Sequence, residues 1–139
     1  MIDPRFKLEN QLCFPLYAAA RKVTGLYTPY FHDLGITYTQ YVVFMVLWEQ
    51  DGITIGELGH RLRLDSGTLT PLLKKMEEKG YVTRKRSSED ERIVRIYLTD
   101  NGRSVQDTLM DVPEKVGCCI DLTPEEAATL YGLLYKILG

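Results

Sequence analysis

The sequence is short of the features that mark exported, membrane-spanning and metal-binding proteins. Its longest strongly apolar and uncharged run, Leu34 to Trp48, is shorter than the ~20 residues that cross a bilayer and includes polar residues. No basic segment followed by an apolar stretch opens the chain, so no export signal is expected. The 3 cysteines do not suit a secreted disulfide framework, and no CxxC or Cys/His spacing indicates zinc. We therefore expect a cytoplasmic protein that binds no membrane, no metal and no other cofactor.

The chain as a whole has little excess of either sign of charge, but its middle segment has an excess of basic residues. The formal net charge of the 139 residues is −2. Residues 61–95 include ten basic and six acidic side chains, so this segment carries +4 and the remainder of the chain carries −6. A basic segment within an acidic protein is typical of a localised phosphate-binding face. A solvated charged surface that binds nothing is the alternative interpretation.

Apolar periodicity and capping residues predict a mainly helical chain of a single domain, residues 1–139. Thr54 and Glu57 have the capping-box spacing, Asp65 and Ser66 suit the start of the next helix, and Gly80 suits its end. The prolines at positions 29, 71 and 113 are expected to end or disturb helices. Helices are expected over about residues 12–28, 38–48, 55–62, 66–79, 100–112 and 124–139.

A winged helix-turn-helix is the fold that this order of elements predicts for residues 35–99. Two short helices joined by a tight turn precede a β-hairpin, whose strands are expected at 82–86 and 94–98. The second helix would lie in the DNA major groove, and the hairpin loop, or wing, would reach a neighbouring minor groove. The DNA contacts expected on the polar face of this helix and on the wing are Ser66, Thr68, Thr70, Lys74, Lys75, Arg84 and Arg86.

One motif in the wing carries a family resemblance. Asp90-x-Arg92-x-x-x-Ile96-x-Leu98-Thr99-x-x-Gly102 resembles the wing signature of MarR-type transcriptional regulators. Segments 8–14 and 64–73 are similar to the organic-hydroperoxide repressor (OhrR-like) branch and its staphylococcal relatives. The resemblance implies a repressor that binds double-stranded DNA at a near-palindromic operator, with Arg92 in the minor groove and Asp90 fixing the wing. It also implies a homodimer formed by the terminal helices, within residues 1–34 and 100–139.

Cys13 is the residue to which the resemblance gives the sensing chemistry. A cysteine with the ordinary pKa of about 8.5 is mostly a thiol at neutral pH, so a sensor must stabilise the thiolate. The resemblance implies that tyrosine hydroxyls do this, and the matching positions are Tyr27 and Tyr38, with Tyr17 nearby. Pro15 lacks an amide hydrogen, so the first helix is expected to kink or to begin near Cys13. Oxidation of Cys13 by an organic hydroperoxide or a related oxidant is then expected to release the operator.

The oxidised sulfur has two expected fates in this family. Sulfenic acid at Cys13 is capped by a low-molecular-weight thiol, or it condenses with a cysteine near the start of the partner subunit's last helix. Cys118 lies in that region of the sequence, and Cys119 is its substitute. The resemblance therefore favours an intersubunit disulfide between Cys13 and Cys118.

Other interpretations of these residues stay open at the level of sequence. Cys13 and the tyrosines could be ordinary buried core residues. The chain could also be a MarR-type repressor that a non-covalent aromatic ligand releases from DNA, without thiol chemistry. A thiol peroxidase is not favoured, because neither paired carboxylates nor an activating histidine accompany Cys13, and His32 and His60 are expected at the surface. We therefore expect a regulator and not an enzyme.

Overall fold

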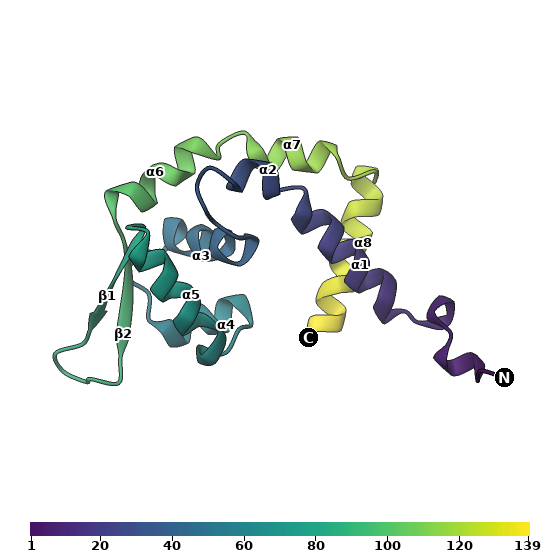
Figure 1. Ribbon diagram of the computed structural model, residues 1–139, viewed down its shortest axis with the longest axis horizontal. Helices are drawn as coiled ribbons and strands as arrows, with labels where there is room; N and C mark the ends of the chain where they lie inside the picture. Colours follow the sequence, from purple (N-terminus) through teal and green to yellow (C-terminus); the bar gives the residue numbers. More distant parts are fainter. The chain divides into compact units, whose positions relative to one another are not determined.

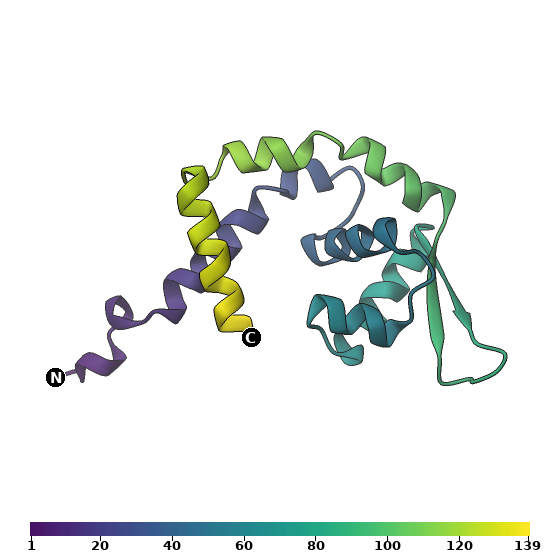
Figure 2. The ribbon, with the colours of Figure 1, turned by 180° about the vertical axis from the view of Figure 1, so that it is seen from behind.

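The computed structural model describes all residues from Met1 to Gly139, and they form two compact units. One unit is Tyr27–Met110, and the other combines Met1–Leu26 with Asp111–Gly139. Figures 1 and 2 show the elements from two sides. In chain order they are η1 (Pro4–Phe6), η2 (Leu8–Asn10), α1 (Cys13–Gly25), α2 (Thr28–Phe31), α3 (Tyr38–Glu49), α4 (Ile55–Leu62), α5 (Ser66–Glu78), β1 (Val82–Arg86), β2 (Val94–Leu98), α6 (Asp100–Thr108), α7 (Val112–Cys118) and α8 (Pro124–Leu138).

The unit Tyr27–Met110 is a winged helix-turn-helix built around a buried apolar core. Its core lies among α3, α4, α5 and the hairpin, which contact one another. The side chains that are essentially fully buried there include Phe44, Leu47, Leu58, Leu69, Leu73, Met76, Val82 and Ile96. β1 and β2 are antiparallel, with Val82 opposite Leu98 and Arg86 opposite Val94. The expected mainly helical fold with one hairpin is therefore confirmed.

Side-chain caps fix where the helices of this unit begin. The Thr54 hydroxyl accepts from the Glu57 amide at 3.1 Å, and the Glu57 carboxylate accepts from the Thr54 amide at the same distance. This is the reciprocal capping box that the sequence predicts at the start of α4. The Asp65 carboxylate accepts from the Thr68 amide at 2.7 Å and so starts α5 one residue later.

The prolines act differently from the expectation. Pro29 and Pro113 lie in the first turns of α2 and α7, where a helix needs no amide hydrogen from them, so they begin helices instead of ending them. α5 runs through Pro71 without a break. α1 begins at Cys13 and has Pro15 in its first turn, which agrees with one of the two expected effects of that proline.

The compact unit Tyr27–Met110 is longer than the winged helix-turn-helix expected over residues 35–99. Residues 27–34 and 100–110 belong to the winged-helix unit and not to the terminal helices. Burial explains the difference, because Phe31 in α2 and Val105 in α6 are only 3% exposed.

The unit made of the two chain ends, unlike the winged-helix unit, leaves the apolar side chains of its long helices exposed. No residue of α1 or of α8 is buried. Apolar side chains are exposed on both helices, among them Leu16 and Tyr17 on α1 and Leu130, Tyr131, Leu133 and Ile137 on α8. None of the helices is long and apolar enough to cross a membrane.

Candidate nucleic-acid interface and thiol site

A short turn joins α4 to α5. Arg63 is the one residue other than glycine with a positive φ, at 55°, and the Leu64 amide donates to the Gly59 carbonyl at 3.0 Å. A Cβ at Gly59 would lie 2.6 Å from the Leu64 carbonyl oxygen, so only glycine allows this approach. The turn therefore has the tight geometry of a helix-turn-helix.

α5 presents a polar face opposite its buried stripe. Leu69, Leu73 and Met76 are buried against the unit. The residues expected to contact DNA from this helix are all exposed, namely Ser66, Thr68, Thr70, Lys74 and Lys75. Hydrogen bonds from Thr68 lower the pKa of Asp65, so this capping carboxylate is ionised at neutral pH.

The wing is held in shape by Asp90. Its carboxylate accepts from the Arg92 amide at 3.0 Å and from Arg92 Nε at 3.2 Å. The hydrogen bonds with Arg92, first from its side chain and then from its amide, lower the pKa of Asp90. The Ser87 hydroxyl accepts from the Asp90 amide at 3.3 Å and closes the loop. The Arg92 side chain is 90% exposed, so its guanidinium projects from a braced loop into solvent.

Two of the basic residues predicted to contact DNA have partners inside the protein. The Arg84 guanidinium donates to the Glu77 carboxylate at 3.1 and 3.3 Å, and the Arg84 amide donates to the same carboxylate at 3.1 Å. Arg86 donates to the Glu91 carbonyl at 2.5 Å. Sequence reasoning therefore missed that Arg84 joins the wing to α5 and that Glu77 is its anchor.

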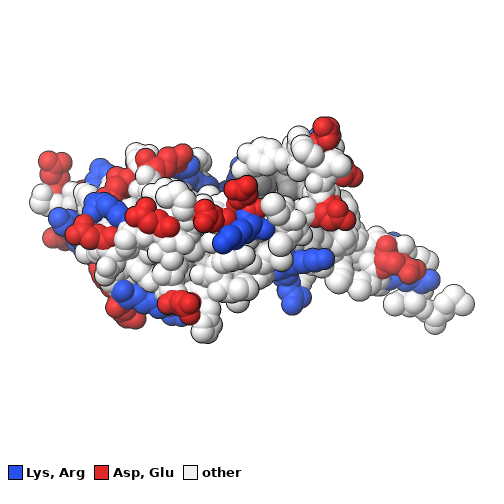
Figure 3. All heavy atoms as spheres, turned by 90° about the horizontal axis from the view of Figure 1, so that it is seen from above, with Lys and Arg blue, Asp and Glu red and all other residues white.

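An open groove of about 450 Å³ brings several of the expected residues together. It lies where the start of α4, the polar face of α5 and the wing meet, and it is lined by Thr54, Ile55, Gly56, Ser66, Thr70, Arg92, Ile93 and Val94. On the face shown in Figure 3, by contrast, basic and acidic side chains are interspersed. That face offers no surface of a single sign to a polyanion.

Tyr27 and Tyr38 belong to an aromatic cluster in the winged-helix unit. The ring of Tyr27 lies 5.2 Å from that of Tyr38, 5.3 Å from that of Tyr41 and 5.4 Å from that of Phe31. Burial raises the pKa of Tyr27, Tyr38 and Tyr41 above the ordinary value. The three phenols therefore keep their protons at neutral pH and are hydrogen-bond donors.

The three cysteines are free thiols on the surface of the chain. Cys13 is the first residue of α1, Cys118 is the last residue of α7, and Cys119 follows it as the cap. Tyr17 lies one turn after Cys13 and carries the Arg21 guanidinium 5.5 Å above its ring. Cys13 and Tyr17 thus belong to one unit, and Tyr27 and Tyr38 belong to the other. Cys13 is exposed in the single chain and does not belong to the buried core of either unit. His32 and His60 are exposed, as expected.

Comparison with known proteins places these features in a family context. Residues 25–109 match the family described as "Transcriptional regulator SarA/Rot". The chain is 46% identical over 132 residues, which are 95% of this chain and 90% of the relative, to the organic hydroperoxide resistance transcriptional regulator of Bacillus subtilis.

Solved structures agree with this match. The structure of reduced AbfR bound to DNA, a protein of Staphylococcus epidermidis, is 36% identical and has a TM-score of 0.80, covering 96% of this chain and 94% of that one. A mutant of MarR from E. coli in complex with operator DNA is 30% identical with a TM-score of 0.87, covering 99% and 100%. The Bacillus relative is a transcriptional regulator, which agrees with the expectation that this chain is a regulator.

Proposed function

Because this chain belongs to the SarA/Rot family of winged-helix transcriptional regulators, we propose that it is a redox-sensing repressor that binds operator DNA as a homodimer. Oxidation of Cys13 by an organic hydroperoxide releases the DNA. The observation that carries this proposal is the exposed free thiol at Cys13 in a chain that matches a hydroperoxide-resistance regulator over 95% of its length.

DNA binding uses the polar face of α5 and the wing. Ser66, Thr68 and Thr70 are short hydroxyl residues near the start of α5, and they reach phosphates or base edges without filling the major groove. Lys74 and Lys75 add salt-dependent phosphate contacts. Arg92 enters the minor groove, and Asp90 keeps its loop in the shape that aims it. Arg84 and Arg86 support the wing from within.

A second copy of the chain covers the exposed apolar side chains of α1 and α8. Leu16 and Leu133 are 39% and 54% exposed, and helices with such faces are stabilised when a partner removes them from water. A two-fold dimer places two α5 helices about 34 Å apart, one turn of DNA. The operator is therefore near-palindromic double-stranded DNA.

The switch is a two-electron oxidation of sulfur. The Cys13 thiolate, stabilised by hydrogen bonds from tyrosine hydroxyls, attacks the terminal oxygen of a hydroperoxide. The O–O bond breaks, an S–O bond forms, and the alkoxide takes up a proton and leaves as the alcohol. The phenols assigned to this role are Tyr27 and Tyr38, which burial keeps protonated, with Tyr17 as a neighbour of Cys13 in its own helix.

The resulting sulfenic acid condenses with a second thiol and releases water. That thiol is the partner subunit's Cys118, with Cys119 as its substitute, or a low-molecular-weight thiol. Non-reducing electrophoresis separates these fates, because only the first gives a covalent dimer. Replacing both Cys118 and Cys119 with serine should abolish the covalent dimer, while Cys119→Ser alone retains it; adducts of the monomer with small thiols alone would exclude the crosslink.

The central experiment compares wild type with Cys13→Ser. An operator is first selected from a random duplex pool with the reduced protein, and its release is then titrated with cumene hydroperoxide, hydrogen peroxide and hypochlorite. We expect wild type to release the operator at the lowest dose of cumene hydroperoxide and Cys13→Ser to keep it. Equal release by both proteins would contradict thiol sensing.

A further inference from the structure

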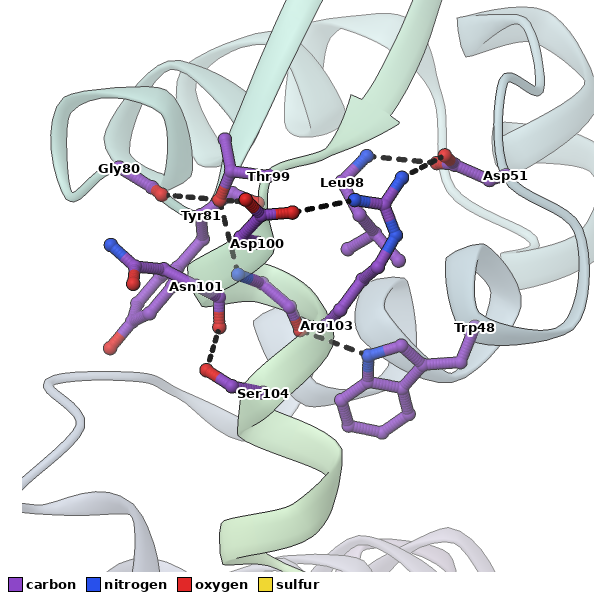
Figure 4. Close-up of polar contacts among 11 residues, drawn as sticks. Trp48, Asp51, Gly80, Tyr81, Leu98, Thr99, Asp100, Asn101, Arg103 and Ser104 are labelled. Carbon is purple, nitrogen blue, oxygen red and sulfur yellow. Dashed lines mark hydrogen bonds and ion pairs between the residues drawn. The ribbon is translucent and has the colours of Figure 1, made fainter.

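The base of the wing is a hydrogen-bonded junction where the ends of α3 and β2 meet the start of α6 (Figure 4). The Thr99 hydroxyl donates to the Gly80 carbonyl at 2.6 Å and accepts from the Gly102 amide at 3.1 Å. From the end of α3, the Trp48 indole donates to the Gly102 carbonyl at 3.0 Å. Asp51, just beyond α3, accepts from the Leu98 amide at 2.8 Å.

Gly102 is closely packed in this junction. A Cβ at Gly102 would lie 2.2 Å from the Tyr81 carbonyl oxygen and 3.0 Å from the Leu98 side chain. The first turn of α6 therefore packs directly on the backbone that enters β1 and on the end of β2. A displacement of Gly102 toward Tyr81 and Leu98 would therefore press on the base of the wing.

Trp48 contacts this junction with its nitrogen and the tyrosine cluster with its ring. Its ring meets the ring of Tyr41 edge-on at 6.4 Å and stacks on Phe44 at 5.4 Å. Tyr41 in turn packs against Tyr27 at 5.3 Å and Tyr38 at 6.0 Å. Asp51 lies three residues further on and also contacts the wing base, but its bonds are to Leu98 and Arg103 and not to the aromatic cluster.

We propose that Trp48 is the positioning residue that relays a displacement of the tyrosine cluster to the wing. The inference rests on the proposed function, in which oxidised Cys13 acts on Tyr27 and Tyr38. A shift of these rings displaces Tyr41 and then the indole plane, which carries the hydrogen bond to Gly102. Since Gly102 packs directly against the base of the wing, its displacement moves Arg92 from the position in which it fits the minor groove.

The test measures operator affinity in the reduced and the oxidised state. Couplings between two sites typically change affinity by about 5–150-fold, and we expect the wild-type ratio in this range. Trp48→Phe keeps a ring against Tyr41 and Phe44 but removes the indole hydrogen. Its reduced-state Kd should stay within about threefold of wild type. The logarithm of its ratio of oxidised to reduced Kd should fall to less than about half of the wild-type logarithm.

Asp51→Asn is the matched control. The amide keeps an oxygen for the Leu98 amide and weakens only the pairing with Arg103. Because this residue lies off the relay, both Kd values should change by the same factor and the ratio should equal that of wild type. A lowered ratio in both variants, or an unchanged ratio in Trp48→Phe, overturns the relay. If wild-type protein itself keeps the operator after oxidation, the proposed function fails and the relay with it.

A second measurement needs no variant at Trp48. It is the single tryptophan of the chain, so emission excited at wavelengths that the tyrosines do not absorb reports on its surroundings alone. Peroxide should shift this emission in wild type in step with operator release, and Cys13→Ser should show no shift. Operator release without any change of the Trp48 emission would contradict the relay even if Trp48→Phe failed to fold.

Discussion

The two units of this protein differ in how far they bury their own apolar side chains. All but two of the buried apolar side chains lie within Tyr27–Met110, where helices and hairpin cover one another. The long helices α1 and α8 of the other unit have no buried residue at all. The winged-helix unit therefore carries its own core, whereas the terminal helices expose the apolar side chains that the proposed dimer would cover.

The largest expected effect comes from placing a charge in the terminal unit. Leu133→Glu should prevent a second copy from covering α8, because a buried carboxylate without a partner is costly. Light scattering should then show a monomer. Operator affinity should fall by about 10²–10⁴-fold, because the two α5 helices no longer bind together. Met45→Glu is the control, since Met45 in α3 is similarly exposed at 48% but belongs to the winged-helix unit. A dimer that survives Leu133→Glu would show that α8 is not the interface.

Glycines give a second way to compare the units. Gly102→Ala should destabilise the protein by about 3 kcal/mol, because the new methyl group would overlap the Tyr81 carbonyl oxygen. At Gly117 in α7 a Cβ would have no neighbouring atom within 4 Å, so Gly117→Ala should leave stability unchanged or raise it by about 0.5 kcal/mol. Urea denaturation measures both values. Equal effects at the two positions would contradict the packing described for the wing base.

A smaller effect separates two arginines of the wing. Arg92→Ala should lower operator affinity and reduce the magnitude of the salt dependence of log K by about 0.9 for each phosphate that Arg92 neutralises. Arg84→Ala should also lower affinity, because the wing is no longer anchored at Glu77, but the salt dependence should stay as in wild type. Titrations of the operator at several salt concentrations distinguish the two, and a reduced slope in Arg84→Ala would show that Arg84 contacts phosphate after all.

The smallest effect is a pH dependence of the wing. Arg92 lowers the pKa of Asp90 in the folded protein, so the bracing is present above the unfolded value of about 3.9 and is lost as the pH falls through the lower folded value. The melting temperature of wild type should therefore exceed that of Asp90→Asn slightly at pH 7, and the two should converge at strongly acid pH. A gap that persists there would mean that the carboxylate charge is not its cause.

Local signals predicted the winged-helix unit well. The capping box at Thr54, the cap at Asp65 and the positive φ of 79° at Gly80 are each set by residues close in sequence. What sequence reasoning missed depends on distant residues. Nothing in the consecutive basic residues of β1 indicates that Arg84 pairs with Glu77 on α5. Nothing near Trp48 indicates that its indole donates to a carbonyl 54 residues away.

The terminal unit was harder to predict for a physical reason. Pro113 is compatible with the end of one helix or the first turn of the next, and only packing decides between them. Likewise, an apolar sequence around Cys13 is compatible with a buried or an exposed thiol. The structure gives the exposed one.

The most direct test of the redox switch counts oxidised Cys13 and released operator in the same sample. Reduced protein on its operator is treated with less than one equivalent of cumene hydroperoxide per thiol, and mass spectrometry then gives the oxidised fraction of each cysteine. We predict that the released fraction of operator rises in proportion to the oxidised fraction of Cys13. Operator release while Cys13 remains a free thiol would contradict the account.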